Sequence, residues 1–208
     1  QLVNLIRITD RNGSSTNPFS ANTYNVDVQH AADLWSTNRL LYGINYRHNS
    51  LSSSATDQFS REDRLGLFIQ DEWRPTAALT IVAGVRYDLH TQINGTWSPR
   101  IALLYQPIEG HTFHASGSVA YRPPTLFESH QDQRVTTTIP TGLPPPFPPS
   151  VSSTVPVIGN SLLDPEQIIS YEVGYQGWYW KHRLRVRTNL FFNHISDLIG
   201  SRITPSGT

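Results

Sequence analysis

Apolar and polar residues alternate along most of the chain. In Leu79–His90 the odd positions carry leucine, isoleucine, alanine, valine and tyrosine, and most even positions carry polar residues or glycine. A period of two held over a dozen residues predicts a β-strand with one apolar and one polar face. The same alternation recurs in His111–Arg122, Ile169–Tyr179 and Arg183–Asn193.

Weaker alternation predicts the remaining strands, which brings the expected total to about nine, with no convincing helix. Strands of about 8–12 residues are longer than those of most soluble sheets and close to the length that a tilted membrane strand needs. The fold class is therefore expected to be all-β. The weaker segments are Leu2–Ile8, Tyr24–His30, Leu40–His48, Arg64–Arg74 and Pro99–Gln106.

The connections between these strands alternate in length. The stretches RPTAA, PIEG and YWKH are tight, whereas NSLSSSATDQFS, TQINGTWS and Pro123–Gln167 are longer. The link Ala31–Arg39 is the exception, because it is expected to be longer than a tight turn. Short turns at one end and long loops at the other are typical of an antiparallel, up-and-down transmembrane β-barrel. We expect this chain to form an incomplete barrel; the alternative is a soluble antiparallel sheet with aromatic side chains in its core.

Composition narrows the function classes. The 208 residues carry 16 basic and 16 acidic side chains, a formal net charge of zero, and no cysteine. A neutral chain argues against a nucleic-acid partner held by bulk charge. The lack of cysteine excludes a disulfide framework and thiolate metal sites from this chain. The sequence shows neither a signal segment nor a run of about 18 apolar residues of the kind that forms a membrane helix.

Four segments resemble a known family. LFIQDEWRPTAALTIVAGVRYDLH, SPRIALLYQP, AYRPPTLFE and GNSLLDPEQIISYEVGY are similar, in order and spacing, to barrel segments of TonB-dependent outer-membrane receptors. Tyr121–Pro124 and Gly159–Glu166 correspond to two sequence boxes of that family. Pro124 and Ser161 depart from its usual pattern, but both boxes lie where only extended backbone is required.

The resemblance implies a receptor in the bacterial outer membrane that imports a bulky, scarce nutrient, most often a ferric siderophore or similar metal chelate. Haem or cobalamin import is one alternative, and a passive pore or adhesion barrel is another. The implied partners are outer-membrane lipid, the metal-chelate ligand and the TonB energy-transducing complex. Residues 1–208 are expected to be part of the barrel domain, without the plug domain and the closing C-terminal strand.

Arginines are expected to gather in the loop-end half of the barrel interior. Only two inward-facing acidic residues, Asp88 and Glu172, are expected to balance the charge of these arginines, and His90 there is able to titrate. In a narrow, water-filled funnel such an excess raises the local concentration of anions, and guanidinium groups bind carboxylate or catecholate oxygens with a planar fork. We therefore expect a site for an anionic chelate; the alternative is a salt-bridge lattice that only supports packing. The expected arginines are Arg47, Arg64, Arg86, Arg100 and Arg122.

Other candidate chemistry is weaker. By resemblance to haem-uptake members, His130 is a candidate axial ligand; otherwise it is a solvated loop residue. Three near-contiguous loop residues, Ser129, His130 and Asp132, seldom converge as a hydrolase triad, so no enzymatic activity is expected. No resident cofactor or metal is expected either. The proline-rich part of Pro123–Gln167 is expected to be extended polyproline II, acting either as a lid over the funnel or as a variable loop.

Overall fold

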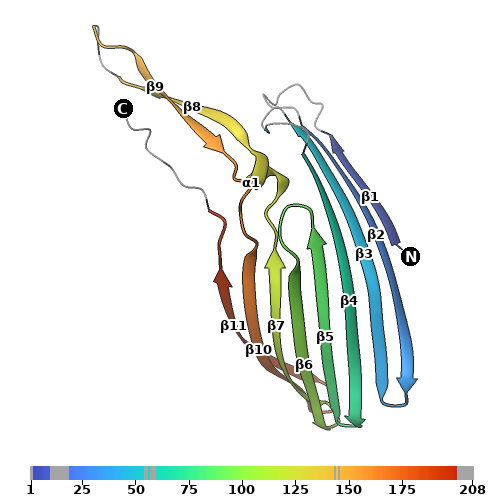
Figure 1. Ribbon diagram of the computed structural model, residues 1–208. Coiled ribbons are helices and arrows are strands. Elements are labelled where there is room, and N and C mark those ends of the chain that lie inside the picture. The colour runs from blue at the N-terminus through green and yellow to red at the C-terminus, as the bar shows by residue number, and fades with distance from the viewer. Residues whose placement is uncertain are drawn as a thin grey trace.

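The computed structural model describes residues 2–9, 19–53, 56, 60–142, 144 and 146–200. Its main feature is a single sheet of nine antiparallel strands, in the order β1-β2-β3-β4-β5-β6-β7-β10-β11 (Figure 1). The strands are β1 (Leu2–Thr9), β2 (Phe19–Trp35), β3 (Asn38–Ser53), β4 (Ser60–Thr76), β5 (Leu79–His90), β6 (Thr96–Ile108), β7 (His111–Arg122), β10 (Glu166–Tyr179) and β11 (Leu184–Ser196).

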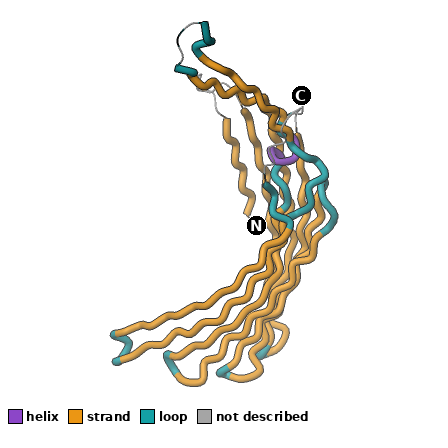
Figure 2. Tube along the Cα trace, turned by 90° about the vertical axis from the view of Figure 1, so that its left-hand side faces the viewer, coloured by secondary structure: helices purple, strands orange, loops and turns teal. Residues whose placement is uncertain are grey.

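The sheet has the up-and-down order that the alternation predicts. Each strand pairs with its neighbour in the sequence, and β7 pairs with β10 across the long intervening segment. The sheet is curved, and in the described part of the chain it remains open between β1 and β11 (Figure 2). The expected fold class, an incomplete antiparallel barrel, is confirmed; the expectation for the closing strand concerns residues 201–208, which lie outside the described ranges.

Most strands are longer than the alternation indicates. β2 and β4 have 17 residues each. The predicted long link Ala31–Arg39 is wrong, because β2 continues through a bulge to Trp35 and only Ser36 and Thr37 separate it from β3. The apolar–polar period breaks at the bulge, so the strand's last residues do not look like a strand in the sequence.

The two faces of the sheet differ in chemistry. One face exposes large apolar side chains, among them Ile69, Ile101, Tyr171 and Phe192, each more than 45% exposed. Contiguous exposed apolar surface of this kind marks contact with a membrane or a partner. The opposite face carries arginine, glutamate, asparagine and glycine. Among the described residues, no helix combines the length and the apolar content required to cross a membrane.

The segment between β7 and β10 is folded. It contains the short helix α1 (Leu126–His130) and a hairpin of β8 (Asp132–Pro140) and β9 (Ser150–Ile158). Thr125 caps α1 and exchanges hydrogen bonds with Glu128 in a capping box, which explains why a helical turn follows Pro124. The predicted polyproline II conformation of the run PTGLPPPFPPSVSSTVP is therefore wrong at Pro140 and in β9, where pairing with β8 through cross-strand Thr and Ser contacts gives a hairpin.

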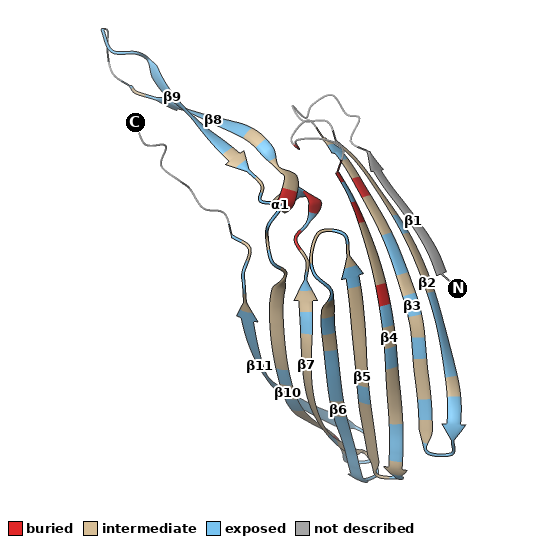
Figure 3. Cartoon of the chain, in the orientation of Figure 1, coloured by how far each residue is buried: buried red, intermediate tan, exposed pale blue. Residues whose placement is uncertain are grey.

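This excursion begins at the end of the sheet where the β3–β4 loop lies. Arg122 is the last residue of β7, as the two following prolines predict. Thr56 of the β3–β4 loop forms an isolated bridge with Gln131, next to α1. Burial concentrates at this junction, where the described residues include buried Leu126 and Pro124 as well as the buried polar residues Glu62 and Ser129 (Figure 3). The long excursion and the β3–β4 loop thus share one end, as predicted.

Candidate ligand-binding site

Strand register brings the predicted residues together on the polar face. Arg47 of β3 lies opposite Arg64 of β4, and Arg64 lies opposite His90 of β5. Residues directly opposite in an antiparallel pair point to the same side of the sheet. Three neighbouring strands therefore place these three side chains in one row at the loop end.

A cavity of about 210 Å³ opens over this row. Its walls include Tyr121 and Pro123, which come from the end of β7 and the residue that follows it. Five of the nine predicted site residues line it together: Arg47, Arg64, Arg86, Asp88 and His90. The structure thus places these five side chains together at the loop end, and their role in ligand binding stays a prediction.

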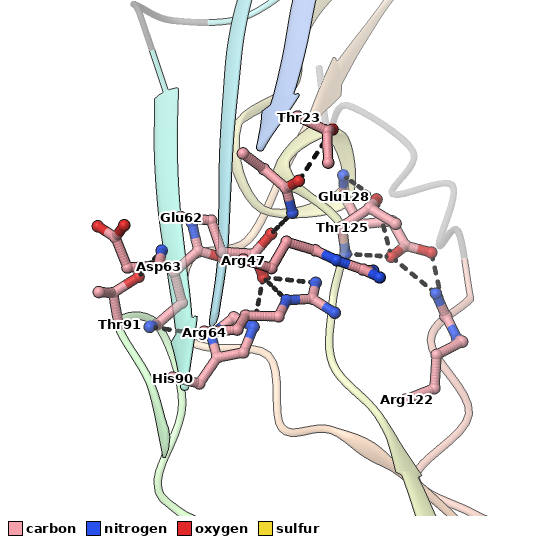
Figure 4. Close-up of polar contacts among 12 residues, drawn as sticks. Thr23, Arg47, Glu62, Asp63, Arg64, His90, Thr91, Arg122, Thr125 and Glu128 are labelled. Carbon is pink, nitrogen blue, oxygen red and sulfur yellow. Dashed lines mark hydrogen bonds and ion pairs between the residues drawn. The ribbon is translucent and has the colours of Figure 1, made fainter. Parts of the chain in front are cut away.

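Glu62 lies beneath the row and is the most deeply buried charged residue there. Its side chain is 2% exposed and forms ion pairs with Arg64, at 2.5 Å, and with His90 (Figure 4). Asn49 donates a third contact to the other carboxylate oxygen at 2.9 Å. A buried carboxylate needs such partners, because an unpaired charge out of water is costly. Glu62 thus fixes the position of Arg64 below the cavity.

Arg86 and Asp88 form a forked pair on β5. The Nε and Nη2 atoms of Arg86 donate to both oxygens of Asp88 at 2.6–2.9 Å. The pair lies over Gly66 of β4, where a Cβ atom would be 2.0 Å from Arg86 Nη2. Glycine at this position leaves room for the fork, because a Cβ atom would push the flexible end of Arg86 aside.

Arg47 and Arg100 differ from the other arginines in their partners. Arg47 donates to the amide oxygen of Asn25 at 3.3 Å, and Arg100 to that of Gln70 at 2.5 Å. Arg100 reaches Gln70 across Gly84, which lies between them in the register and has no side chain to obstruct the contact. Within the described ranges neither guanidinium has an acidic partner, so their charge is not neutralised locally.

Arg122 lies at the rim and is fully engaged. It donates to both oxygens of Glu128 at 3.1 Å (Figure 4) and to Glu166 at 2.5 Å. These contacts tie α1 and β10 to the end of β7. Burial raises the pKa of Glu128, but the hydrogen bonds from Arg122 and Thr125 outweigh this and leave that pKa below its ordinary value. Arg122 is thus a structural tie in this structure, not a free anion-binding group.

The expected charge balance of the site is wrong in one respect. Besides Asp88, which pairs with Arg86, three further carboxylates pair with the predicted arginines: Glu62, Glu128 and Glu166. Glu62 falls in the segment that the sequence assigns to the β3–β4 loop, because alternation is clear only from Arg64 onward. The sequence could have indicated the contact, because residues two apart on a strand lie on the same face. With β4 beginning at Ser60, Glu62 therefore lies on the same face as Arg64.

Four predicted site residues do not line this cavity: Arg100 and Arg122, described above, and Glu172 and His130. Glu172 lies 3.4 Å from His114 and accepts a hydrogen bond from Asn189 at 2.9 Å. His130 lies on α1 with Nδ1 3.3 Å from the carbonyl oxygen of Leu126. In the part of the chain that the structure describes, no three His, Cys, Asp or Glu residues are placed to hold a metal ion.

Comparisons with known proteins agree with this architecture. The chain is 23% identical over 158 residues to the probable TonB-dependent siderophore receptor PirA of Acinetobacter baumannii. The matched region covers 73% of this chain and 20% of the relative. The crystal structure of the siderophore receptor PirA from Pseudomonas aeruginosa superposes with a TM-score of 0.72 at 18% identity, over 86% of this chain and 33% of the other.

A mutant of the ferric enterobactin receptor PfeA of Pseudomonas aeruginosa, in complex with enterobactin, superposes with a TM-score of 0.71 at 22% identity. That match covers 95% of this chain and 30% of the receptor. The chain therefore spans between a fifth and a third of these relatives. Residues 4–208 match the family described as TonB dependent receptor-like, beta-barrel, and the chain belongs to that family.

Proposed function

We propose that this chain is part of an outer-membrane receptor that imports an anionic metal chelate, most simply a ferric siderophore, with energy supplied through the TonB complex. The observation that carries the proposal is the pair Arg47 and Arg100, whose guanidinium groups hydrogen bond to amide oxygens and carry no acidic partner among the described residues. Arg47 lines the cavity of about 210 Å³ together with Arg64 and Arg86, and Arg100 lines a second cavity whose wall also includes Arg86.

The remaining contacts explain how such a site would work. The buried Glu62 and the fork with Asp88 hold Arg64 and Arg86 in place before any ligand arrives. Arginines held in this way lose little side-chain freedom on binding, which favours affinity. A planar guanidinium matches carboxylate or catecholate oxygens with two donors. The oxygen atoms of an iron-bound chelate fit these donors.

The comparisons support the same direction. The curated relative is named a siderophore receptor, and a structural neighbour holds enterobactin. The exposed apolar face fits a lipid environment, and long loops at one end fit the outside of the cell. A passive pore built on the same strands would not require energy, so uptake that stops when the proton gradient is collapsed distinguishes active import from that alternative.

The test uses the intact receptor carrying Arg47→Gln or Arg100→Gln. We expect normal assembly in the outer membrane and about tenfold weaker binding of a ferric siderophore for each variant, because each removes a charged hydrogen-bond donor. The loss should be larger at low salt, where charge attraction is less screened. Arg39→Gln, on β3 near the short-turn end, is the matched control. Unchanged affinity in both variants would overturn the proposal.

A further inference from the structure

The hairpin that joins β10 to β11 carries an excess of positive charge. From Gly177 to Ser196 the sequence contains no Asp or Glu. Four cationic side chains lie in the same stretch, and none of them forms an ion pair in the described part of the chain. Lys181, the one lysine of the protein, lies in the turn itself. The cationic residues are Lys181, Arg183, Arg185 and Arg187.

The turn has a defined shape that exposes a tryptophan. Trp180, Lys181 and His182 have φ values of 51°, 58° and 65°, a left-handed conformation that L-residues rarely adopt. The Arg183 N–H donates to the carbonyl oxygen of Tyr179 at 3.1 Å and closes the turn. Trp180 is 75% exposed as a result.

Contacts on the strands hold this surface in place. The guanidinium carbon of Arg185 lies 5.4 Å from the centre of the Trp178 ring, and the His182 ring lies 5.6 Å from it. Arg185 and Arg187 both donate to the amide oxygen of Gln176. An aromatic face and an amide are neutral partners, so these contacts leave Arg185 and Arg187 uncompensated on the polar face of the sheet. The charges available to a lipid headgroup are those of the turn itself, Lys181 and Arg183.

The other short turns at this end are different. The β2–β3 turn is flanked by both Asp33 and Arg39, and the β6–β7 turn carries Glu109. Arg74, beside the β4–β5 turn, is paired with Glu72 at 2.5 Å. The β10–β11 turn lies at the same end, since the Trp178 N–H donates to the carbonyl oxygen of Gly110 in the β6–β7 turn at 2.9 Å.

We infer that the β10–β11 turn binds the headgroups of anionic phospholipids. The inference takes its orientation from the proposed function, in which short turns face the periplasm and lie beside the inner, phospholipid leaflet. An exposed indole beside cationic groups suits this depth, because tryptophan partitions to the headgroup region while lysine and arginine attract phosphate. Phosphate oxygens are the complementary partner for the uncompensated charges of Lys181 and Arg183.

The experiment uses the intact receptor, purified and reconstituted into bilayer discs of phosphatidylcholine with or without phosphatidylglycerol. Native mass spectrometry counts the lipids that remain bound. The variant Lys181→Gln/Arg183→Gln should retain phosphatidylglycerol at least about tenfold less well than the unmodified receptor, because two charges near the lipid surface are lost. The matched control, Arg39→Gln/Arg74→Gln on neighbouring turns, should behave like the unmodified receptor.

High salt supplies a second measurement that needs no variant, since it should weaken phosphatidylglycerol retention by the unmodified receptor and leave phosphatidylcholine unaffected. Equal retention of the two lipids, or an equal loss in the control, would overturn the inference. So would cross-linking of Trp180 to an acidic protein while lipid retention is unchanged. None of these lipid-binding measurements depends on siderophore uptake. A negative result would therefore contradict lipid binding by the turn without contradicting the proposed import function.

Discussion

Glu62 and His90 form an ion pair in which both side chains are almost completely buried, 2% and 3% exposed, although the sheet around them exposes most of its residues. The pair joins β4 to β5 directly below the arginine cavity. Its partners Arg64 and Asn49 extend the contact to the side chains of β3 and β4. This buried carboxylate, not an apolar core, organises the loop end of the sheet.

Replacing Glu62 should therefore be costly. In the intact receptor, Glu62→Gln should lower the free energy of unfolding by about 3–5 kcal/mol, because Arg64 loses the buried carboxylate that opposes its charge. Urea titration of the receptor folded in detergent measures this. Glu72→Gln, which breaks the more exposed contact with Arg74, should cost about 0–1 kcal/mol. Similar losses for the two variants would contradict the assignment.

The tie between Arg122 and Glu128 should make the anchoring of the β8–β9 hairpin depend on pH. Because the pKa of Glu128 is lowered in the folded state, its stabilising contribution is complete above the ordinary carboxyl pKa and is lost as pH falls through the lowered value. Protease added to whole cells should cleave the hairpin, and more rapidly in acid. Protection on intact cells, with cleavage only after permeabilisation, would contradict the outward orientation of the hairpin.

Glu128→Gln separates this tie from other acid effects. At neutral pH the variant should be cleaved about two- to fivefold faster than the unmodified receptor, since a partly exposed pair contributes little once solvent screening is considered. Its cleavage rate should also lose the acid dependence. Arg134→Gln, in β8 and outside the tie, serves as the control and should retain both the rate and the pH profile.

The strands were predictable because barrel strands carry their signal in alternation, and β5 and β7 have the predicted boundaries. Faces followed from the same parity, so Arg47, Arg64 and Arg86 could be placed together. Other features depend on contacts between distant segments. The burial of Glu62 becomes visible only when β3, β4 and β5 are aligned in register and α1 lies against β4.

For Arg122 the position was predictable from the sequence, but its contacts were not. The sequence correctly places it at the end of β7, but its role depends on Glu128, six residues later, and Glu166, on a strand reached after the hairpin. Alternation carries no information about which loop residue folds back. The hairpin β8–β9 was missed because its prolines suggested polyproline II, whereas paired hydroxyl and β-branched residues satisfy a ladder.

Gly66 should control the position of the arginine fork, at a modest cost in stability when it is replaced. A Cβ atom there would meet the mobile end of Arg86, so Gly66→Ala should displace Arg86 from Asp88 at a cost of about 1–2 kcal/mol in the free energy of unfolding. Siderophore affinity should change with it. Gly117→Ala is the control, because its Cβ would make ordinary contact with Tyr171 at 3.5 Å. Unaltered affinity in Gly66→Ala would show that the fork does not position the ligand.

The bridge between Thr56 and Gln131 offers a way to fix α1 against the sheet. The 208 residues contain no cysteine, so Thr56→Cys/Gln131→Cys introduces a single defined pair. Opposed residues of an antiparallel bridge lie about 4.5–5.5 Å apart at Cα, which is within the range of a disulfide. We expect the bond to form when the receptor is oxidised on the cell surface.

Fixing α1 in this way should slow siderophore uptake, because Thr125, Leu126 and Phe127 cover a cavity of about 330 Å³ beside Glu62 and Arg64. Addition of a reductant should restore uptake, and each single-cysteine variant should be unaffected by oxidant. If the disulfide forms, as shown by loss of free thiol, and uptake continues at the unmodified rate, α1 does not need to move. The arginines would then be reached by a path that leaves α1 in place.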